Sequence, residues 1–338
     1  MTRFLSPLKL FVTGLVLLGV AFGVLWLVPS GSYIFLPDRA HPLAPLVSVP
    51  GERRSKDGGG IYYVDVFVRK ATLLERVFPS IREGSTVVPA SSLRAPGESE
   101  EQLQRQELHE MRQSQSTAAA VALEALGYDK LVDLRGIAIG QVRAHMPAAA
   151  ANVRPGDMLI GVDGKPALTV CTLQHRLAAR PLGAPVVLDV RRGRSVRQVR
   201  VTPVLDPSTG RRLIGVVAQD SYSLRKLPLR VRFDLGGVGG PSAGLAFALE
   251  LLEARGRDVD HGLRVAATGM IEPDGCVDQI GGVKQKTLGA LHSHVDILLV
   301  PAGDNAREAR RYAHGLRVVP VKSFRQAVQA LTAMAPNA

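Results

Sequence analysis

Cysteine is scarce in this chain of 338 residues, which contains Cys171 and Cys276 and no others. The two lie about a hundred positions apart, and neither belongs to a repeated cysteine pattern of the kind that holds structural zinc. A small scaffold stapled by several disulfides is therefore excluded. At most one disulfide can form, but we expect the two thiols to stay unpaired, and we expect no metal site.

Aromatic residues make up 5% of the chain and charged residues 21%, yet the formal net charge is +12. The basic excess is concentrated at 191–232, which has eleven Lys or Arg residues against two acids. Nucleic-acid binders interleave such bases with aromatics that stack on nucleobases, and this interleaving is missing here. The phosphate-loop signature G-x-x-x-x-G-K-[ST] is missing as well. These absences argue against a nucleic-acid partner and against a nucleotide, and we expect no cofactor.

One long hydrophobic run is present. Residues 10–28, LFVTGLVLLGVAFGVLWLV, carry no charge and would span about 28 Å as a helix, close to the hydrocarbon thickness of a bilayer. Arg3 and Lys9 precede the run and the next basic residue is Arg39, so the positive-inside rule places the N-terminus in the cytoplasm and the rest outside. We therefore predict residues 1–33 to be a cytoplasmic tip and a single-pass anchor in the cell membrane. The alternative is a signal peptide cleaved after Ser32.

The segment 34–129 is predicted to be a linker followed by a covering region. Proline, glycine and charged residues dominate up to residue 60, which is typical of a linker. The β-branched and aromatic run IYYVDVFV predicts a strand at 61–68. Apolar or alanine positions at 108, 111, 118, 122 and 125 follow a helical period that stops at Gly127. We expect this helix to pack against or cover another element.

Residues 130–205 have a different pattern. A strand at 135–142 is followed by a short alanine helix, an Arg-Pro-Gly-Asp turn at 154–157, a strand, an Asp-Gly turn at 163–164, a helix and a hairpin. This series resembles a PDZ domain of the bacterial, protease-associated type. The resemblance implies a sheet edge that binds an extended peptide, and it matches that edge to Arg135, Gly136, Ile137 and Ala138. The alternative is a module that packs structurally and binds no free peptide.

The stretch LRVRFDLGGVGGPSAGLAFALELLEARG, residues 229–256, predicts a strand, a glycine loop and a helix. Ser242 stands where the loop becomes the helix. Glycines let backbone N–H groups approach a substrate, and a helix N-terminus favours developing negative charge, so the position suits an oxyanion. Taken alone, Ser242 is better explained as a helix N-cap than as a catalytic residue. The match to G-x-S-x-G also leaves open a serine esterase whose base is one of the downstream histidines, His261, His292, His294 or His314.

Downstream, TGMIEPDGCVDQIGGVKQK completes a pattern that, together with GGPSAG, resembles the proteolytic domain of Lon-type Ser/Lys proteases. The resemblance implies that Ser242 is the nucleophile and that Lys284, the first lysine of Lys-Gln-Lys, is the general base, with Lys286 as the rival. Thr268 matches the hydroxyl that hydrogen-bonds the lysine. Two positions later the family usually has an acid, whereas this chain has Met270.

A lysine can act as this general base only if its pKa is lowered. At its reference pKa a lysine is almost wholly protonated at neutral pH, so burial must lower that pKa before the amine can take the serine proton. Backbone amides from Gly240 to Ala243 are expected to hold the oxyanion. A histidine is then not needed.

The sequence thus predicts an α+β protein with an N-terminal transmembrane helix, a PDZ-like module at 130–205 and a Lon-type α/β proteolytic domain at 206–338. This arrangement is similar to the YlbL group of Lon-like proteases, which implies an ATP-independent serine endopeptidase acting on polypeptides outside the membrane. Rings are common for such domains, so a homo-oligomer, with a hexamer as one form, is expected. The alternative from another class is a PDZ adaptor whose protease domain is a relic.

Overall fold

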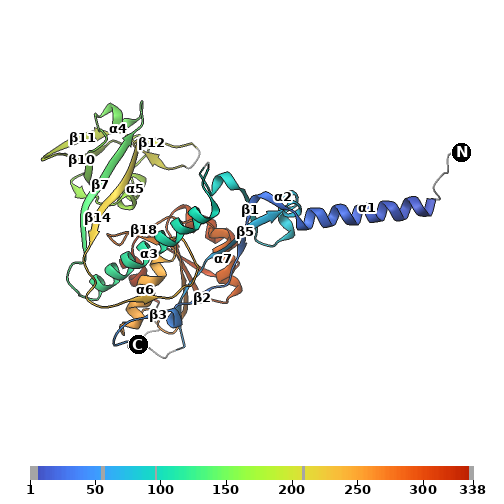
Figure 1. Cartoon of the computed structure of the whole chain (residues 1–338). Helices are drawn as coiled ribbons and strands as arrows, with labels where there is room; N and C mark the ends of the chain where they lie inside the picture. The colour runs from blue at the N-terminus through green and yellow to red at the C-terminus, as the bar shows by residue number, and fades with distance from the viewer. Residues whose placement is uncertain (1–6, 55–57, 96, 208–209, 335–338) are drawn as a thin grey trace.

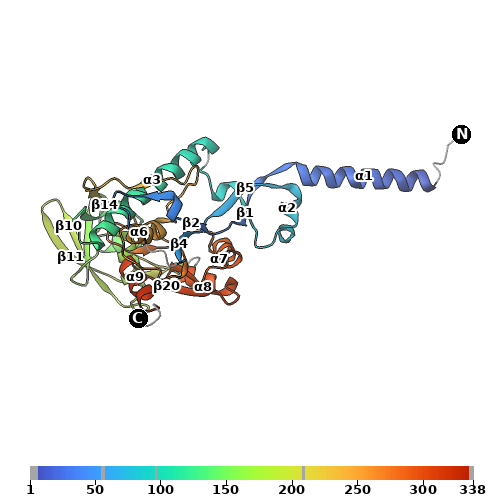
Figure 2. The ribbon, with the colours of Figure 1, turned by 90° about the horizontal axis from the view of Figure 1, so that it is seen from below.

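The computed structural model describes residues 7–54, 58–95, 97–207 and 210–334. Helix α1 (Pro7–Leu27) projects away from the rest, and a small sheet lies at its base. A larger α/β body follows, and the β-rich module built from β7, β8, β10, β11 and β14 lies at the other end (Figures 1 and 2). Within the described ranges, no helix has both the length and the hydropathy needed to cross a membrane.

The small sheet has the strand order β5-β1-β6. Strand β1 (Pro29–Pro37) pairs with β5 (Val66–Thr72) on one side and with β6 (Thr86–Pro89) on the other. Helix α2 (Leu73–Val77) follows β5 directly, because Thr72 and Glu75 form a reciprocal capping box at its start. In the described sheet β5 has a partner on one side only, so it is an edge strand.

A five-stranded sheet forms the centre of the larger body. Its order is β2 (His41–Pro42), β4 (Gly60–Tyr63), β16 (Arg264–Ala267), β19 (Ile297–Pro301) and β20 (Arg317–Val321). The last four strands are parallel, and β19 is buried along its whole length, as expected for a sheet covered on both faces. The strand expected at 61–68 is thus divided: β4 joins this sheet, β5 joins the small one, and Asp65 lies between them. The N-terminal segment therefore supplies a strand to the larger body and is not only a cover.

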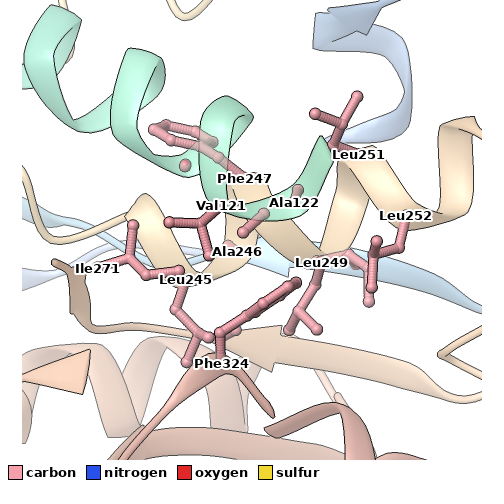
Figure 3. Packing of buried hydrophobic residues seen from close by; sticks show 14 of the residues in the cluster. Val121, Ala122, Leu245, Ala246, Phe247, Leu249, Leu251, Leu252, Ile271 and Phe324 are labelled. Atoms are coloured by element: carbon pink, nitrogen blue, oxygen red, sulfur yellow. The ribbon is translucent and has the colours of Figure 1, made fainter. Parts of the chain in front are cut away.

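Helices cover both faces of this sheet, and alternate strand residues point to them. Val265, Ala267 and Leu299 belong to the core that contains residues of α3 (Glu100–Ala125), α6 (Gly244–Ala254) and α9 (Phe324–Thr332). Ala266 and Leu298 belong to the core that contains residues of α7 (Val283–His292) and α8 (Asp304–Tyr312). Helix α6 is buried on every side, and Figure 3 shows its leucines and Phe247 packed beside Val121 and Ala122 of α3.

The β-rich module has its own hydrophobic core and a six-stranded sheet of order β11-β10-β8-β7-β14, with β9 paired to β8. Its helices are α4 (Pro147–Ala150) and α5 (Val170–Ala178). The strands are β7 (Val132–Val142), β8 (Met158–Val162), β9 (Lys165–Pro166), β10 (Val186–Arg192), β11 (Ser195–Val201) and β14 (Val216–Leu224). Asp163 and Gly164 both have positive φ, as the expected Asp-Gly turn requires.

Short two-stranded pairs complete the fold. Strand β3 (Val47–Ser48) pairs with β15 (Arg232–Phe233), and β12 (Val204–Leu205) pairs with β13 (Arg212–Leu213). Strand β17 (Met270–Ile271) pairs with β18 (Val277–Asp278) to form the β17–β18 hairpin. This hairpin leads away from the end of β16 toward the β-rich module.

The two cysteines form a disulfide, so the expectation of unpaired thiols is wrong. Cys171 in α5 and Cys276 just before β18 are separated by 105 residues in sequence, but their Cα atoms are 6.2 Å apart. They meet because α5 packs against the turn of the β17–β18 hairpin, where Thr169 and Thr172 both hydrogen-bond Asp274. The spacing of two cysteines in the sequence does not show that the distant segments carrying them come into contact.

Candidate active site

Ser242 is fixed at the start of α6 by the segment that follows β16. Its carbonyl oxygen accepts hydrogen bonds from the Gly269 N–H at 2.8 Å and from the Thr268 hydroxyl at 3.2 Å. The residue is half-buried, two positions before the first residue of α6. Its hydroxyl therefore stands near the positive end of a helix, as the sequence predicted.

The lysine beside Ser242 is Lys286, which corrects the prediction of Lys284. Lys286 Nζ lies 2.7 Å from Ser242 Oγ. Lys284 Nζ instead donates to the carbonyl oxygen of Ser85 at 2.9 Å and lies 5.6 Å from the centroid of the Tyr312 ring. Helix α7 begins at Val283, and two positions along a helix turn a side chain by about 200°. The two lysines therefore point to opposite sides of α7, and only one can reach the serine.

Thr268 links Ser242 to Lys286. It follows β16 directly, is buried, and lies 3.3 Å from Lys286 Nζ through its hydroxyl oxygen. The same hydroxyl donates to the Ser242 carbonyl, so it accepts from the amine and donates to the backbone. The resemblance placed Thr268 on the lysine, and the structure places it on Lys286.

Burial sets the charge state of Lys286. Its side chain is 4% exposed, and desolvation lowers its pKa to about 8, because removing water penalises the ammonium form. The nearby negative charge of Asp65 acts in the opposite direction and favours the ammonium. At neutral pH a minority of molecules therefore hold a free amine, which is far more than an exposed lysine would provide.

Sequence reasoning missed Asp65. It lies in the cleft with Ser242 and Lys286, and desolvation raises the pKa of its carboxyl group. Asp65, from the N-terminal segment, thus supplies a negative charge near Lys286, whereas Met270 carries none. The strand pattern in the sequence runs through 61–68 without interruption, so it gave no indication that Asp65 lies between two strands.

Helix α3 holds the glycine loop in front of the serine. The Gly240 N–H donates to the carbonyl oxygen of Glu107 at 3.0 Å, and the Ser114 hydroxyl donates to the Pro241 carbonyl at 2.9 Å. The Gly240 amide, expected as an oxyanion donor, is thus occupied by α3. Ala243, the other expected donor, is the buried N-cap residue of α6.

A cleft of about 480 Å³ opens in front of Ser242 and Lys286. Edge strand β5 contributes Val66 and Val68 to it, and α3 contributes Leu103 and Glu107. The glycine loop, including Val238, forms another part of the wall. An exposed strand edge of this kind is suited to an extended polypeptide.

The peptide-binding edge expected at residues 135–138 is not an edge. Ile137 pairs with Leu159 of β8 on one side and with Asp220 of β14 on the other. The described sheet ends on this side in β14, and a groove of about 280 Å³ lies between α5 and the segment Gly215–Ala218, which leads into β14. The predicted residues Arg135, Gly136, Ile137 and Ala138 all lie on β7, which has β8 on one side and β14 on the other, so the open edge on this side of the described sheet is β14.

Ser242 Oγ is hydrogen-bonded to an amine rather than to an imidazole, which bears on the esterase alternative. His261 lies 3.7 Å from Asp258, and His261, His294 and His314 occupy left-handed turn positions. His292 is the last residue of α7. The described geometry thus favours lysine as the partner of the serine.

Three groups of described side chains have ligand atoms within 4.8 Å of one another and are candidates for a metal. They are Cys171/His175/Cys276, Asp38/His41/Asp65 and Glu253/Asp258/Asp260. In the first group the two sulfurs are bonded to each other, which removes the thiolates that a metal would need.

Comparison with known families finds two domains in the chain. Residues 220–332 match the Lon protease (S16) C-terminal proteolytic domain, and residues 108–202 match a PDZ domain. The chain therefore contains both domains. Strand β14, which starts at Val216, belongs by its pairing to the PDZ sheet although most of it lies within the span matched to the Lon domain.

Three curated proteins show the extent of the similarity. The Lon protease of Xanthomonas oryzae pv. oryzae is 37% identical over 87 residues, covering 25% of this chain and 10% of that protein. The Lon protease of Mesomycoplasma hyopneumoniae is 32% identical over 91 residues, covering 26% and 10%. The HhoB protein of Synechocystis sp. is 34% identical over 68 residues, covering 20% and 16%. The chain thus spans between 10% and 16% of the lengths of these relatives, whose names and the Lon-type domain support a peptidase.

Proposed function

Because the chain joins a Lon-type proteolytic domain to a PDZ domain, we propose that it is an ATP-independent serine endopeptidase in which Ser242 is the nucleophile and Lys286 the general base. The observation that carries this proposal is the 2.7 Å contact between Lys286 Nζ and Ser242 Oγ, made by a buried lysine of lowered pKa. A desolvated amine in hydrogen-bond contact with a hydroxyl is what a Ser/Lys mechanism requires.

The reaction begins with neutral Lys286. Its amine takes the proton from the Ser242 hydroxyl while Oγ bonds to the carbonyl carbon of the scissile peptide. The negative charge that develops on the carbonyl oxygen is stabilised at the N-terminal end of α6, where Ala243 caps the helix. The Lys286 ammonium then gives its proton to the departing amine, and water releases the acyl group by the reverse sequence. Thr268 keeps the amine directed at Oγ throughout.

The test compares the two neighbouring lysines. Ser242→Ala and Lys286→Ala should each lower cleavage of an internally quenched peptide by about 10²-fold or more, because each removes a group that moves with the proton. Lys284→Ala is the matched control on the same helix and should keep most of the activity. Lys286→Arg should be inactive, since arginine stays protonated. Full activity of Lys286→Ala with loss in Lys284→Ala would restore the assignment made from the sequence.

Nucleotide independence is tested in the same assay. Cleavage by the purified full chain should proceed without added ATP, and ATP with Mg²⁺ should leave the rate unchanged. A rate that rises several-fold with ATP would contradict this part of the proposal.

For the PDZ domain we propose recruitment of a polypeptide by its carboxyl terminus in the groove between α5 and β14. Val217 is 47% exposed on β14 and lines this groove. Val217→Asp should weaken binding of free-carboxylate peptides, because it places a like charge beside the peptide. Val196→Asp, at an exposed position on the opposite end strand β11, is the control and should bind normally. Equal binding by both variants would place the peptide elsewhere.

We also propose that residues 10–28 attach the chain to a membrane and that the catalytic domain faces an oxidising compartment. Support comes from the uncharged run and from the disulfide, because disulfides persist outside the reducing cytosol. The full chain should stay with membranes after carbonate extraction, and protease added outside should degrade it. Release by carbonate would contradict the anchor.

The homo-oligomer expected from the sequence also stays a proposal, and sedimentation of the detergent-purified chain tests it.

A further inference from the structure

The turn of the β17–β18 hairpin is attached to the PDZ domain at one carboxylate. Thr169 Oγ1 and Thr172 Oγ1, at the start of α5, donate to Asp274 Oδ2 at 2.8 and 2.6 Å. The other oxygen of Asp274 accepts the N–H of Cys276 at 3.0 Å, and Cys276 is bonded to Cys171 of α5. Hydrogen bonds and a covalent bond thus join the same two elements.

A second carboxylate contact lies beside the first. Asp220 of β14 accepts the Val170 N–H, the first of α5, at 2.7 Å. It also shares a side-chain hydrogen bond with Glu272 of the hairpin, whose pKa burial and Asp220 raise to about 8. Two carboxyl groups share a hydrogen bond only when one carries the proton, so Glu272 is largely protonated at neutral pH. The hairpin therefore contacts α5 and β14, which are the two walls of the peptide groove.

The other end of the hairpin leads directly to the nucleophile. Gly269, next to Met270 of β17, donates its N–H to the Ser242 carbonyl, and Thr268 contacts both Ser242 and Lys286. Ile271 lies so close to Gly244 that a Cβ at Gly244 would meet it at 3.1 Å. A shift of the hairpin would therefore move the groups that orient Ser242.

The helix held by the disulfide also lines the groove. Val170, Leu173, Gln174 and Leu177 of α5 face it together with the start of β14. A peptide seated there contacts α5 directly, and α5 cannot move without the hairpin because Cys171 and Cys276 are covalently joined. The groove and the Ser242 site are thus connected through one short element.

We propose that the Cys171–Cys276 disulfide couples occupancy of the PDZ groove by a peptide carboxyl terminus to the rate of proteolysis at Ser242, and that reduction uncouples them. This inference rests on the proposed function. Reduction by a dithiol breaks the S–S bond and adds two electrons and two protons to form two thiols, while the dithiol closes to its own disulfide. After reduction only hydrogen bonds, such as those to Asp274, join α5 to the hairpin. Because these bonds can break and reform, α5 can then move without the hairpin.

The experiment uses the full chain and two different peptides. The groove probe is a hexapeptide with a free carboxylate, selected from a C-terminal library for binding to the full-length Ser242→Ala protein. The reporter is an internally quenched substrate amidated at its C-terminus, so that it does not compete for the groove. We expect saturating probe to change kcat/KM of the oxidised protein by about 5-fold or more.

The variant is Cys171→Ser with Cys276→Ser. It should bind the probe with unchanged Kd and cleave the reporter at the basal rate of the oxidised protein, but the effect of the probe should fall below about 2-fold. Dithiothreitol should produce the same loss in the wild-type protein and no change in the double variant, which controls for effects of the reductant elsewhere.

The outcomes separate this inference from the proposed function. A probe effect that persists in the double variant, the absence of a probe effect in the oxidised protein, or a library without a binder overturns the coupling while cleavage by Ser242 and Lys286 stands. Wild-type protein that does not cleave the reporter, or a Ser242→Ala protein that does, overturns the proposed function and the coupling with it.

Discussion

The proposed chemistry depends on Lys286, whose burial lowers the pKa of its amine. The same burial that lowers its pKa to about 8 also makes the charged form costly within the folded protein. Activity and stability therefore respond to pH through one side chain, and each response can be measured separately.

The rate of peptide cleavage should follow the titration of this amine. Below pH 8, kcat/KM should rise about tenfold per pH unit, and it should level off above pH 8, because only the neutral amine accepts the serine proton. Asp65→Asn should move the midpoint to lower pH, since the Asp65 charge raises the pKa of Lys286. Lys284→Ala should leave the profile unchanged. A flat profile between pH 6 and 9 would remove Lys286 as the base.

The lowered pKa of Lys286 should also make the stability of the folded protein depend on pH. Between pH 8 and 10.5 the unfolded chain binds the Lys286 proton more tightly than the folded one, so stability attributable to this group rises with pH in that window and is lost below it. Lys286→Met should thus raise the free energy of unfolding at pH 7 by up to about 3 kcal/mol, and the gain should disappear near pH 10.5. Urea unfolding at both pH values tests this, with Lys284→Met as the control. Destabilisation by Lys286→Met at pH 7 would contradict the calculation.

At the residue scale, the sequence located Ser242 and Thr268 correctly but not the lysine that lies beside them. The Gly-Pro-Ser-Ala-Gly motif located Ser242, and Thr268 was found from its neighbours. The choice between Lys284 and Lys286 depends on which side of α7 faces the serine, and this orientation is set by packing against Ser85 and the glycine turn. Asp65 could not be predicted, because no local pattern shows which distant segment fills the cleft.

Helix α3 carries no functional motif in its sequence, yet it has a central position among the elements. The helix period predicted it up to Gly127, and it spans Glu100–Ala125. Its contacts with the glycine loop could not be predicted, because they join a backbone carbonyl to a backbone amide and involve no characteristic side chain. The expectation that it covers another element is nevertheless consistent with where it lies.

Two loop glycines give a matched test of this contact. A Cβ at Gly239 would lie 2.7 Å from Cβ of Glu107, whereas a Cβ at Gly237 would meet nothing within 4 Å. Gly239→Ala should therefore displace the loop by several tenths of an ångström and lower kcat about 10- to 100-fold, because small misplacements of reacting groups are costly. Gly237→Ala should stay near the wild-type rate. Equal rates in the two variants, with unchanged Tm, would show that the loop position is not critical.

In the whole molecule, the PDZ domain is inserted into the proteolytic body. Leu224 pairs with Val132, so the chain leaves and returns at adjacent points, and both residues pack against the core of the body. Pro-Gly-Asp and Asp-Gly turns revealed the module from the sequence. The insertion itself was not visible, because β4 and β16 pair in parallel across all of it, and such pairing has no local signature.

Excision of the insert tests this description. Replacement of residues 136–220 by a short Gly/Ser turn, with Cys276→Ser, leaves Arg135 and Ser221 in neighbouring strand positions. The remaining chain should unfold cooperatively and keep basal cleavage within about tenfold, because its core and its Ser242–Lys286 pair are intact. Circular dichroism and the quenched-peptide assay measure both. Loss of the cooperative transition would show that the body depends on the PDZ domain to fold.

The parallel pairing of β4 with β16 also determines the order in which the chain can mature. Gly60 of β4 finds its partner at Arg264, 264 − 60 = 204 residues later. At about 5 to 20 residues per second, a ribosome needs roughly 10 to 40 s to make that partner available. During this interval β4 has β2 on one side but no β16 on the other, while all the strands of the PDZ domain have already been synthesised. An unfinished chain can therefore hold a complete PDZ domain before β16 and the Ser242–Lys286 pair exist.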